Sequence, residues 1–488
     1  MIKNIISLLS CREKTGELLD VQETKQRIIV VSNRVDNGRS ESNSPGGLTV
    51  AVRAVLKQRG GVWVGWSGRT CDTGGQAYLE KDEHNDITFA LLDLKSGDVE
   101  NYYHGFSNQT LWPLLHSCIQ FVELRDEYLH SYENVNEIFA SNILTLLQEG
   151  DIVWVHDYHL IPLARKLRER GCLNRLAFFL HVPWPNVDLL DCIPQEKNRS
   201  REIYYKLVED MQEYDATGFQ TDADVNNFNE AIRSRKDKST AIPASLKPIS
   251  TNCISAYGVS IETRLFALKA QKAVKSNDLL NFRRTLSGQQ LLIGVDRLDY
   301  TKGVENRILG VEACINGRSA LSKKITYLQI SPASRSQVLA YQELSKRVAE
   351  KIATVNGTLG TTDWAPIRYI TRPQTREVLA GLYRLARIGL ITPSRDGMNL
   401  VAKEYVAAQN PKNPGVLILS KYAGASAELK EALLIDPDDT QDIASAIYTA
   451  LDMPLSERKS RWKKMMDHLL ICDVYKWCNT VINDVMKT

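Results

Sequence analysis

The sequence lacks most of the short patterns that identify common classes of enzymes and binding proteins. Its nine cysteines are scattered and include no CxxC pair, so neither a zinc ribbon nor a disulfide framework is indicated, and reduced thiols in a cytoplasmic protein are expected. It contains no GxGxxG fingerprint, no P-loop GKS or GKT, no HExxH helix and no GxSxG elbow. No apolar stretch approaches the length of a membrane span, so we expect no membrane partner.

An excess of charge of one sign is also missing. The chain has 61 basic and 58 acidic residues, for a formal net charge of +3. This balance does not indicate a nucleic-acid partner, so each basic side chain is judged by its own position. The length of 488 residues predicts about two to three domains. Residues 1–26 show no clear signal-cleavage site and are predicted to be an N-terminal extension.

What the sequence does contain is an alternation of short apolar runs with amphipathic helical segments. Several runs are continuously apolar, which is typical of strands buried on both faces of a parallel sheet. The alternation predicts an α/β fold with right-handed crossovers. The clearest predicted strands are residues 27–32, 151–155, 176–181, 218–221, 291–295, 325–331, 388–392 and 416–420.

The alternation is interrupted once, at residues 266–288, which are polar and helical without a strand. We therefore predict two doubly wound domains, at residues 27–265 and 289–453, joined by a linker at 266–288. Residues 454–488 form an amphipathic pattern rich in Trp, Met and Lys, which predicts a C-terminal helical tail.

Charged and polar residues follow many of the predicted strands. In open parallel sheets, ligands bind beyond the carboxyl ends of the strands. The gathering of such residues at these ends favours a binding site over chance. The residues in question are Asn33, Arg34, His156, Asp157, His159, His181, Asp296, Arg297, Asp299, Lys302, Ser334 and Arg335.

The segment LITPSRDGMNLVAKEYVAA (residues 390–408) is the most informative about function. Gly397 permits conformations closed to other residues, so the chain can pass close to a ligand. Asn399 and the following amides would form a helix start that suits phosphate. Asp396 and Glu404 would lie about two turns apart near one face. This arrangement suits a nucleotide-sugar, but an N-capped surface helix with a solvated glutamate is an equally good interpretation of the segment alone.

Two further segments suit phosphate groups. Arg297 and Lys302 follow a buried strand and could hold a diphosphate, one by a planar fork and the other as a point charge. The alternative is a surface ion-pair network with Asp296 and Asp299. In SPGGL (residues 44–48), Gly47 could present its amide to an anion at a helix start.

The histidines and aromatics allow two interpretations each. His156 and His159 are predicted to be partly buried and satisfied rather than metal ligands, since no third ligand is evident. Asp157 is a candidate for binding a hydroxyl, and His181 follows an apolar strand where it needs a partner or ligand. Six aromatics could line a sugar pocket, although half of them are expected in the core: Trp63, Trp66, Tyr102, Tyr103, Phe106 and Trp112.

Taken together, the motifs resemble the trehalose-6-phosphate synthase family, glycosyltransferase family 20. The resemblance runs from about Arg27 to the C-terminus and rests on SNR, SPGGL, GWSG, YYHGFSNQTLWP, HDYHL, FFLHVPWP, GVDRLDYTKG, ASR and SRDGMNLVAKEYVAAQ. It implies a GT-B fold of two Rossmann-like domains facing a cleft, with a last helix that crosses back to the first domain. It also implies retaining, metal-independent and cofactor-free transfer of glucose from UDP-glucose to glucose 6-phosphate.

The resemblance assigns roles to individual residues. The leaving phosphate itself would deprotonate the acceptor hydroxyl, since no protein nucleophile is obvious. Direct participation in catalysis is implied for Asp157, His181, Arg297, Lys302 and Asp396. Donor binding is implied for Gly47, His181, Arg297, Lys302, Asp396, Gly397, Met398, Asn399, Leu400 and Glu404. Acceptor binding is implied for Arg34, Trp66, Tyr103, Trp112, Asp157 and Arg335.

The sequence departs from the family pattern in two places and leaves alternatives open. Residues 195–207 are more polar than usual, and the turn at 258–262 lacks the usual proline. We expect a homo-oligomer (dimer or tetramer) and a separate trehalose-6-phosphate phosphatase in the pathway. Alternatives are a transferase using ADP- or GDP-glucose or an acceptor such as glycerol 3-phosphate, and a catalytically silent sugar-phosphate-binding regulator.

Overall fold

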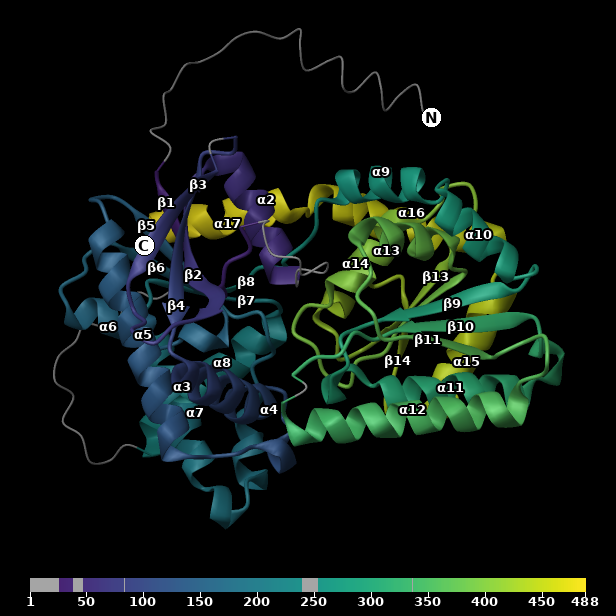
Figure 1. Cartoon of the computed structure of the whole chain (residues 1–488), viewed down its shortest axis with the longest axis horizontal. Coiled ribbons are helices and arrows are strands. Elements are labelled where there is room, and N and C mark those ends of the chain that lie inside the picture. Colours follow the sequence, from purple (N-terminus) through teal and green to yellow (C-terminus); the bar gives the residue numbers. More distant parts are fainter. Residues whose placement is uncertain (1–25, 38–46, 83, 239–252, 336) are drawn as a thin grey trace, which may run out of the picture.

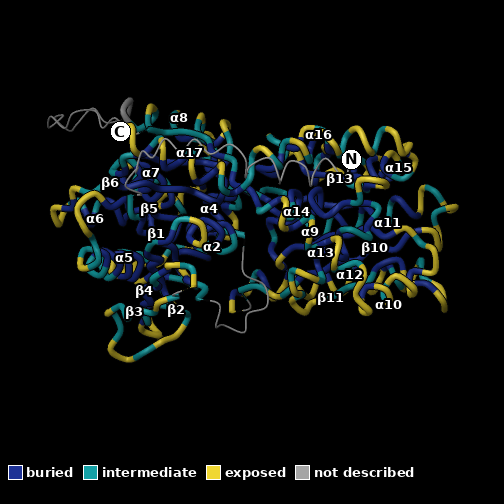
Figure 2. Tube along the Cα trace, turned by 90° about the horizontal axis from the view of Figure 1, so that it is seen from above, coloured by how far each residue is buried: buried dark blue, intermediate teal, exposed yellow. Residues whose placement is uncertain are grey.

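The computed structural model describes residues 26–37, 47–82, 84–238, 253–335 and 337–488. Two α/β domains lie side by side, each built on its own sheet (Figure 1). The central strands of both sheets are buried, whereas edge strands such as β3 and the outer faces of the helices carry exposed residues (Figure 2). The predicted fold of two α/β domains with parallel sheets is therefore confirmed.

The N-terminal sheet has eight strands in the order β3-β4-β2-β1-β5-β6-β7-β8. All neighbours pair in parallel except β3, which runs antiparallel to β4 at one edge. The bounds are β1 (Ile28–Arg34), β2 (Gly61–Thr70), β3 (Ala77–Asp82), β4 (Ile87–Leu94), β5 (Ile152–His156), β6 (Arg175–Phe179), β7 (Ala216–Phe219) and β8 (Cys253–Ala256). Sequence analysis did not single out β2, β3, β4 or β8.

The C-terminal sheet has six strands, all parallel, in the order β11-β10-β9-β12-β13-β14. Strands β9, β10, β12 and β13 are buried along almost their whole length, which is why their sequences are continuously apolar. The bounds are β9 (Gln290–Val295), β10 (Ile325–Ile330), β11 (Ile367–Ile370), β12 (Ile388–Ile391), β13 (Val416–Ser420) and β14 (Leu433–Ile435).

Helices cover both sheets. A wide π-type helix, η1 (Val99–Leu111), precedes α4 in the N-terminal domain. The helices before the second sheet are α2 (Gly47–Arg59), α3 (Ser96–Asp98), α4 (Trp112–Leu115), α5 (Asp126–Leu146), α6 (Leu163–Glu169), α7 (Arg199–Met211), α8 (Asp222–Lys238), α9 (Thr263–Ala273) and α10 (Asn277–Thr285). Those that follow β9 are α11 (Val304–Gly317), α12 (Leu339–Leu359), α13 (Arg376–Leu385), α14 (Leu400–Ala408), α15 (Thr440–Asp452), α16 (Leu455–Ile471) and α17 (Val474–Lys487).

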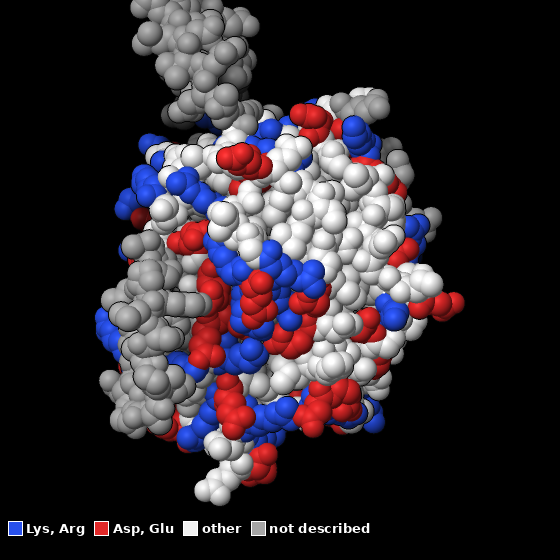
Figure 3. Space-filling model, turned by 90° about the vertical axis from the view of Figure 1, so that its left-hand side faces the viewer, with Lys and Arg blue, Asp and Glu red and all other residues white. Residues whose placement is uncertain are grey.

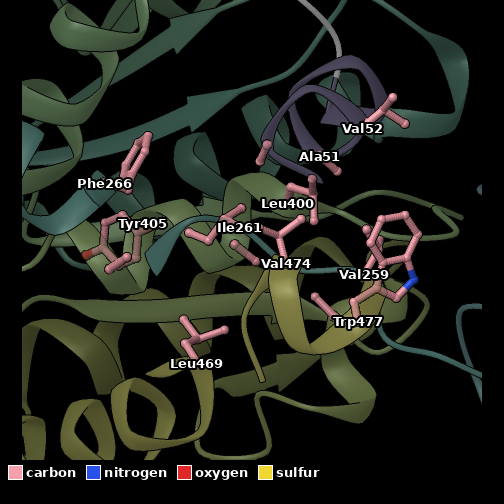
Figure 4. Packing of buried hydrophobic residues seen from close by; sticks show 14 of the residues in the cluster. Ala51, Val52, Val259, Ile261, Phe266, Leu400, Tyr405, Leu469, Val474 and Trp477 are labelled. Atoms are coloured by element: carbon pink, nitrogen blue, oxygen red, sulfur yellow. The ribbon is translucent and has the colours of Figure 1, made fainter. Parts of the chain in front are cut away.

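The two domains share one hydrophobic cluster, which fixes how they face each other. It includes Val52 of α2, Ile261 before α9, Leu400 of α14 and Trp477 of α17 (Figure 4). The Trp477 ring lies 4.9 Å from that of Trp154 in β5. The last helix therefore packs on the N-terminal sheet, while α16 lies with the C-terminal domain (Figure 1).

Residues 266–288 lie largely within α9 and α10, which pack on α13 and α14 of the C-terminal domain. The domain boundaries given above stay a prediction. On the outer side of the N-terminal domain, basic and acidic side chains are interleaved (Figure 3). There Arg165 pairs with Asp210 at 2.6 Å and with Glu133 at 3.0 Å. Within the described residues, none of the helices combines the length and apolarity needed to cross a membrane.

Candidate active site

The carboxyl ends of β5 and β6 meet those of β10 and β12 between the domains. Three contacts show this: Arg335 Nη2 donates to the Tyr158 hydroxyl at 3.2 Å, Arg395 Nη1 donates to Ser117 Oγ at 2.6 Å, and Met398 Sδ lies 3.0 Å from His181 Nδ1. We refer to this region as the interdomain site. It contains most of the residues that the strand-end rule selected.

Arg335 crosses from the C-terminal domain to the N-terminal one. Its side chain is only 5% exposed, and its guanidinium carbon lies 3.9 Å from the centroid of the Trp112 ring, an arrangement of cation and aromatic face that is favourable. Its backbone has a φ of +50°, a strained value for a non-glycine residue that is often found at functional sites. Burial lowers its pKa, but the Tyr158 and Tyr341 hydroxyls and Asp299 together raise the pKa above the ordinary value.

Asp299 orients Arg335. This carboxylate is fully buried, and its Oδ2 accepts from Arg335 Nη1 at 3.3 Å and from the Tyr341 hydroxyl at 3.1 Å. Its Oδ1 accepts from the amide and the hydroxyl of Thr301, both at 3.1 Å. Burial alone would raise the pKa of Asp299, but Arg335, Arg297 and Lys302 hold it below the ordinary value. Sequence analysis placed Asp299 among the strand-end residues and in the alternative ion-pair network, but it assigned no partnership with Arg335.

Arg297 lies on the same indole but keeps access to solvent. Its side chain is 49% exposed, its Nη2 lies 4.0 Å from Asp299 Oδ2, and its guanidinium carbon lies 5.5 Å from the Trp112 centroid. Trp112 is buried, and its Nε1 has no hydrogen-bond partner among the described residues. Two guanidinium groups thus lie against one indole ring, a concentration of positive charge that suits an anionic ligand.

Lys302 does not join the predicted surface network with Asp296 and Asp299. Its Nζ instead donates to Asp396 Oδ2 at 2.6 Å, and the two side chains are 9% and 13% exposed. Asn399 Nδ2 donates to the same oxygen at 3.1 Å. This part of the alternative interpretation is therefore wrong, because the partner of Lys302 comes from a loop 94 residues further along the chain.

A buried arginine is hydrogen-bonded to the loop that carries Lys302. Arg307 is fully buried; its Nη2 donates to the Lys302 carbonyl at 3.0 Å and its Nη1 to Asp296 Oδ2 at 2.7 Å. Its Nε donates to Thr392 Oγ1 at 3.0 Å, at the end of β12. Burial lowers the pKa of Arg307, but Asp296 and the Tyr327 hydroxyl raise it above the ordinary value. Arg307 was not found from sequence, since its helical pattern is that of an ordinary exposed arginine.

Gly397 serves a different purpose from the one predicted. Its φ is not in the left-handed region, and a Cβ there would lie 2.4 Å from the His181 carbonyl oxygen and 2.7 Å from the Val182 Cα. Glycine is therefore needed for contact between the backbones of the two domains. The left-handed residue is Asn399, with φ of +65°, whose side chain caps α14 by accepting from the Ala402 amide at 3.1 Å.

The start of α14 also faces the start of α2. A Cβ at Gly47 would lie 2.9 Å from Leu400 Cδ1, so these two predicted donor residues are neighbours. Residues 44–46 of the SPGGL motif lie outside the described residues. Amides at a helix start favour an anion, and two helix starts face each other here.

Glu404 lies within α14, which begins only at Leu400, so Asp396 precedes the helix. The placement of Asp396 in the turn before the helix agrees with the prediction, whereas Glu404 lies about one turn from the helix start rather than about two. Glu404 Oε1 accepts from Arg376 Nη2 at 2.9 Å. Burial raises the pKa of Glu404, and Arg376 opposes that shift without cancelling it. Arg376 was not identified from sequence.

Two histidines are hydrogen-bonded to each other beneath Met398. His156 Nδ1 lies 3.0 Å from His181 Nε2. Burial lowers the pKa of His181 to about 3, and burial together with His181 lowers the pKa of His156 well below its ordinary value, so both rings are neutral at physiological pH. His156 and His159 are buried, but the prediction that both are satisfied is wrong, because His156 Nε2 and His159 Nδ1 have no hydrogen-bond partner among the described residues. Within the described residues, no group of three His, Cys, Asp or Glu side chains could hold a metal ion.

Asp157 has a positive φ and a raised side-chain pKa. Its φ is +74°, and its Oδ1 accepts from the His181 amide at 3.3 Å. Loss of hydration raises the pKa of this carboxyl to about 7, although two backbone amides and the charges of Arg297 and Arg335 oppose the shift. A half-buried carboxyl of this kind can accept from or donate to a ligand hydroxyl near neutral pH.

The remaining predicted acceptor residues form an aromatic group in the N-terminal domain. The Arg34 guanidinium lies 5.5 Å from the Trp66 centroid, and the Trp66 and Tyr103 rings are 5.7 Å apart. A Cβ at Gly68 would lie 2.4 Å from Arg34 Nη2, so this glycine makes room for the guanidinium. Tyr102 is fully buried and donates to Asn33 Oδ1 at 2.8 Å, which makes it a core residue.

The chain is similar to known proteins over nearly its whole length. Residues 20–487 match the sequence profile of glycosyltransferase family 20. The chain is 44% identical over 470 residues to the trehalose-6-phosphate synthase of Sinorhizobium fredii, covering 94% of this chain and 98% of that protein.

Two solved structures are similar to the fold as well as the sequence. One is an alpha,alpha-trehalose-phosphate synthase (UDP-forming) from Burkholderia xenovorans in complex with glucose-6-phosphate. It is 38% identical with a TM-score of 0.87, over 94% of this chain and 100% of that chain. The other, trehalose-6-phosphate from E. coli bound with UDP-2-fluoro glucose, is 36% identical with a TM-score of 0.85, over 95% and 99% of the two chains.

Proposed function

The chain belongs to glycosyltransferase family 20, and we propose that it transfers glucose from UDP-glucose to glucose 6-phosphate, giving alpha,alpha-trehalose 6-phosphate and UDP. The observation that carries this proposal is the placement of Arg335 and Arg297 on Trp112, 3.9 Å and 5.5 Å from its ring centroid. Cations of one domain thereby complete an aromatic pocket of the other. A solved relative binds glucose-6-phosphate and another binds UDP-2-fluoro glucose, which supports both substrates.

On the donor side, Arg297 and Lys302 stabilise the charge that grows on the departing diphosphate. Asp396 binds hydroxyl groups of the transferred glucose. Its Oδ2 lies 2.6 Å from Lys302 Nζ, so each of the two side chains holds the other in position. The amides at the start of α14 add partial positive charge, and Glu404 binds the ribose. Such preorganised charge is usually the largest single contribution to catalysis.

On the acceptor side, Arg34 and Arg335 hold the 6-phosphate while Trp66, Tyr103 and Trp112 surround the sugar. Arg335 is held by Asp299 and Tyr158, so little reorganisation is needed when the phosphate binds. Asp157, whose pKa is raised to about 7, contacts a hydroxyl of the substrate. Its neighbour His181 is neutral and donates or accepts one hydrogen bond without adding charge.

The reaction retains configuration at the anomeric carbon. The bond from that carbon to the diphosphate oxygen breaks, the acceptor hydroxyl oxygen bonds to the same face, and its proton passes to the departing phosphate oxygen. Neither Asp396 nor Glu404 is a general base, because each is engaged by a cation, Lys302 and Arg376 respectively. Closure of the two domains would exclude water and limit donor hydrolysis.

The test is a nucleotide-release assay that crosses UDP-, ADP- and GDP-glucose with glucose 6-phosphate and glycerol 3-phosphate. We expect release only with UDP-glucose and glucose 6-phosphate, with the product identified by mass and by the configuration of both anomeric carbons. Turnover with glycerol 3-phosphate alone would replace the acceptor. Absence of turnover with every pair would leave the catalytically silent regulator as the better interpretation.

We further propose that no metal or cofactor takes part, so that activity survives dialysis against EDTA. The protein acts in the cytoplasm as a homo-oligomer, and a separate phosphatase consumes its product. Light scattering tests the assembly: a monomeric mass at micromolar concentration would contradict it.

A further inference from the structure

A second cluster of arginines lies at the other end of the C-terminal sheet. It lines a cavity of about 400 Å³, large enough for a small ligand. The cavity is formed where β9, β12 and β13 begin, by residues such as Leu291, Arg387 and Gly415. Because these strands are parallel, their first residues lie at the opposite edge from the interdomain site. Helix α10, which contributes Arg283, lies on the side of this domain away from the N-terminal domain (Figure 1).

Positive charge in this cavity has no acidic counterpart. Its lining includes Arg283, Arg384, Arg387 and Arg458 but no Asp or Glu. In the part of the chain that the structure describes, none of the four arginines forms an ion pair with a carboxylate. This is unusual in a chain with 61 basic and 58 acidic residues, where most buried cations of the interdomain site have a carboxylate partner.

The arginines do make hydrogen bonds, and these explain part of their presence. Arg384 Nη1 donates to the Ala408 carbonyl at 2.8 Å, at the end of α14. Arg387 Nη2 donates to the Ala450 carbonyl at 2.7 Å, at the end of α15. Arg458 Nη1 donates to Asn413 Oδ1 at 2.7 Å and to the Pro414 carbonyl at 2.5 Å.

Capping does not balance the charge. A helix C-terminus supplies about half a negative charge, so the two helix ends offset about one of four positive charges. Two buried nitrogens, Arg387 Nη1 and Arg458 Nε, have no acceptor among the described residues. Burial, and after it the charge of Arg458, lowers the pKa of Arg387 to about 10. A bound anion with several oxygens would reduce the repulsion between the arginines and would supply hydrogen-bond acceptors to these two nitrogens.

We propose that this cavity is a binding site for a small phosphate ester, separate from the interdomain site. Guanidinium groups match phosphate oxygens in pairs. The amide side chains of Gln289, Gln290 and Asn410 line the same cavity and suit the hydroxyls of the ester. This site does not depend on the function proposed above, because it shares no residue with the interdomain site.

The test must separate the two phosphate sites, so it starts from full-length protein carrying Lys302→Ala and Arg335→Ala, which disables the interdomain site. Calorimetric titration with inorganic pyrophosphate is expected to show one remaining site. Adding Arg283→Gln and Arg458→Gln, which leaves Arg384 and Arg387 in place, should weaken it at least about tenfold, since each charge-assisted hydrogen bond is worth roughly 1.5–3 kcal/mol.

Lys459→Gln is the matched control, because it removes one positive charge from an exposed position next to Arg458 on α16. It should change the affinity by less than about twofold. Arg283→Gln alone is a second check: Arg283 is exposed and its loss should not disturb folding. Circular dichroism and the midpoint of thermal unfolding without anion report the fold of every variant.

A repeat titration with glucose 6-phosphate identifies the ligand class. Binding at the same stoichiometry, lost in the same variants, supports a phosphate ester. The proposal fails if the interdomain variant binds no pyrophosphate, if the arginine and Lys459 variants bind equally, or if pyrophosphate binds but the phosphate ester does not.

Discussion

The cations at the two ends of the C-terminal sheet have opposite kinds of partner, and their side chains are buried at the carboxyl end but only partly buried at the amino end. At the carboxyl end, Lys302 pairs with Asp396, Arg335 with Asp299, and Arg307 with Asp296. At the amino end, Arg384, Arg387 and Arg458 meet only carbonyl groups and one asparagine. At the carboxyl end the carboxylate partners hold the cations in fixed positions, but these carboxylates must be buried as well. The second end keeps the excess charge that attracts an anion but orients it less firmly.

Cations that are paired with a carboxylate and cations that are not serve different tasks. A catalytic site gains from charges whose orientation is fixed before the transition state forms. A buried ion pair with additional hydrogen bonds provides such rigidity, although its desolvation makes it a weak contributor to stability. A site that only binds an anion needs the uncompensated field more than the rigidity.

The largest expected effect is on catalysis at the carboxyl end. Arg297→Ala should lower kcat/KM by about a thousandfold, which is roughly 4 kcal/mol of lost transition-state stabilisation. Arg297 is half-exposed, so the thermal unfolding midpoint should stay close to that of the parent protein. Initial-rate kinetics at saturating glucose 6-phosphate measure the effect. Near-normal activity would remove Arg297 from the stabilisation of the leaving group.

The next effect concerns stability. Arg307→Gln leaves Asp296 buried without its cation, and we expect the free energy of unfolding to fall by about 3–5 kcal/mol. Combining it with Asp296→Asn should recover a large part of that loss, because no buried charge then remains. Urea unfolding of the single and double variants forms the cycle. Equal losses in both would show that hydrogen bonds, rather than the ion pair, matter at this position.

A third prediction uses the raised pKa of Asp157, about 7 against an ordinary value of about 3.9. The folded protein therefore holds this proton more tightly than the unfolded chain, and the stabilising contribution is complete below about pH 4. It is lost as the pH rises from about 4 to 7 and stays lost above that range. The stability of the parent relative to Asp157→Asn should fall with pH over this window. A rising or flat difference in urea midpoints would contradict the predicted direction.

The smallest effect is expected at the amino end. Arg384→Gln removes hydrogen bonds to the Ala408 and Gln409 carbonyls but leaves no carboxylate unpaired, so we expect a loss of about 1 kcal/mol. Part of this loss is offset because repulsion with the other arginines decreases. Urea unfolding in parallel with Arg307→Gln tests the comparison directly. A loss as large as that of Arg307→Gln would mean that pairing does not distinguish the two ends.

The strands that could be predicted from the sequence are those buried on both faces, because burial on both faces requires a continuous run of apolar residues. Strands β9 and β13 are buried on both faces, and their continuous apolar runs indicated this directly. β3 was missed because it is a half-exposed edge strand with charged residues. β2 was missed because its two tryptophans, Trp63 and Trp66, were interpreted as possible pocket residues rather than as parts of a strand.

The candidate site was predictable in its members but not in its pairings. The strand-end rule selected Asp157, Arg297 and Arg335, since the position beyond a parallel strand can be counted along the chain. It could not show that Asp299 holds Arg335 or that Arg376 holds Glu404. Arg307 was invisible for the same reason: three of its partners come from the ends of different strands and loops.

By itself, then, the sequence determined the α/β architecture, the family and most of the residues at the carboxyl ends of the strands. These depend on local periodicity and on motifs that are contiguous in the chain. The tertiary structure alone decided which acid meets which cation, why Gly397 must be a glycine, and that four arginines from α10, α13, α16 and the start of β12 share one cavity. Such facts depend on distances between segments far apart in the chain, and electrostatic energy follows distance in space rather than separation in sequence.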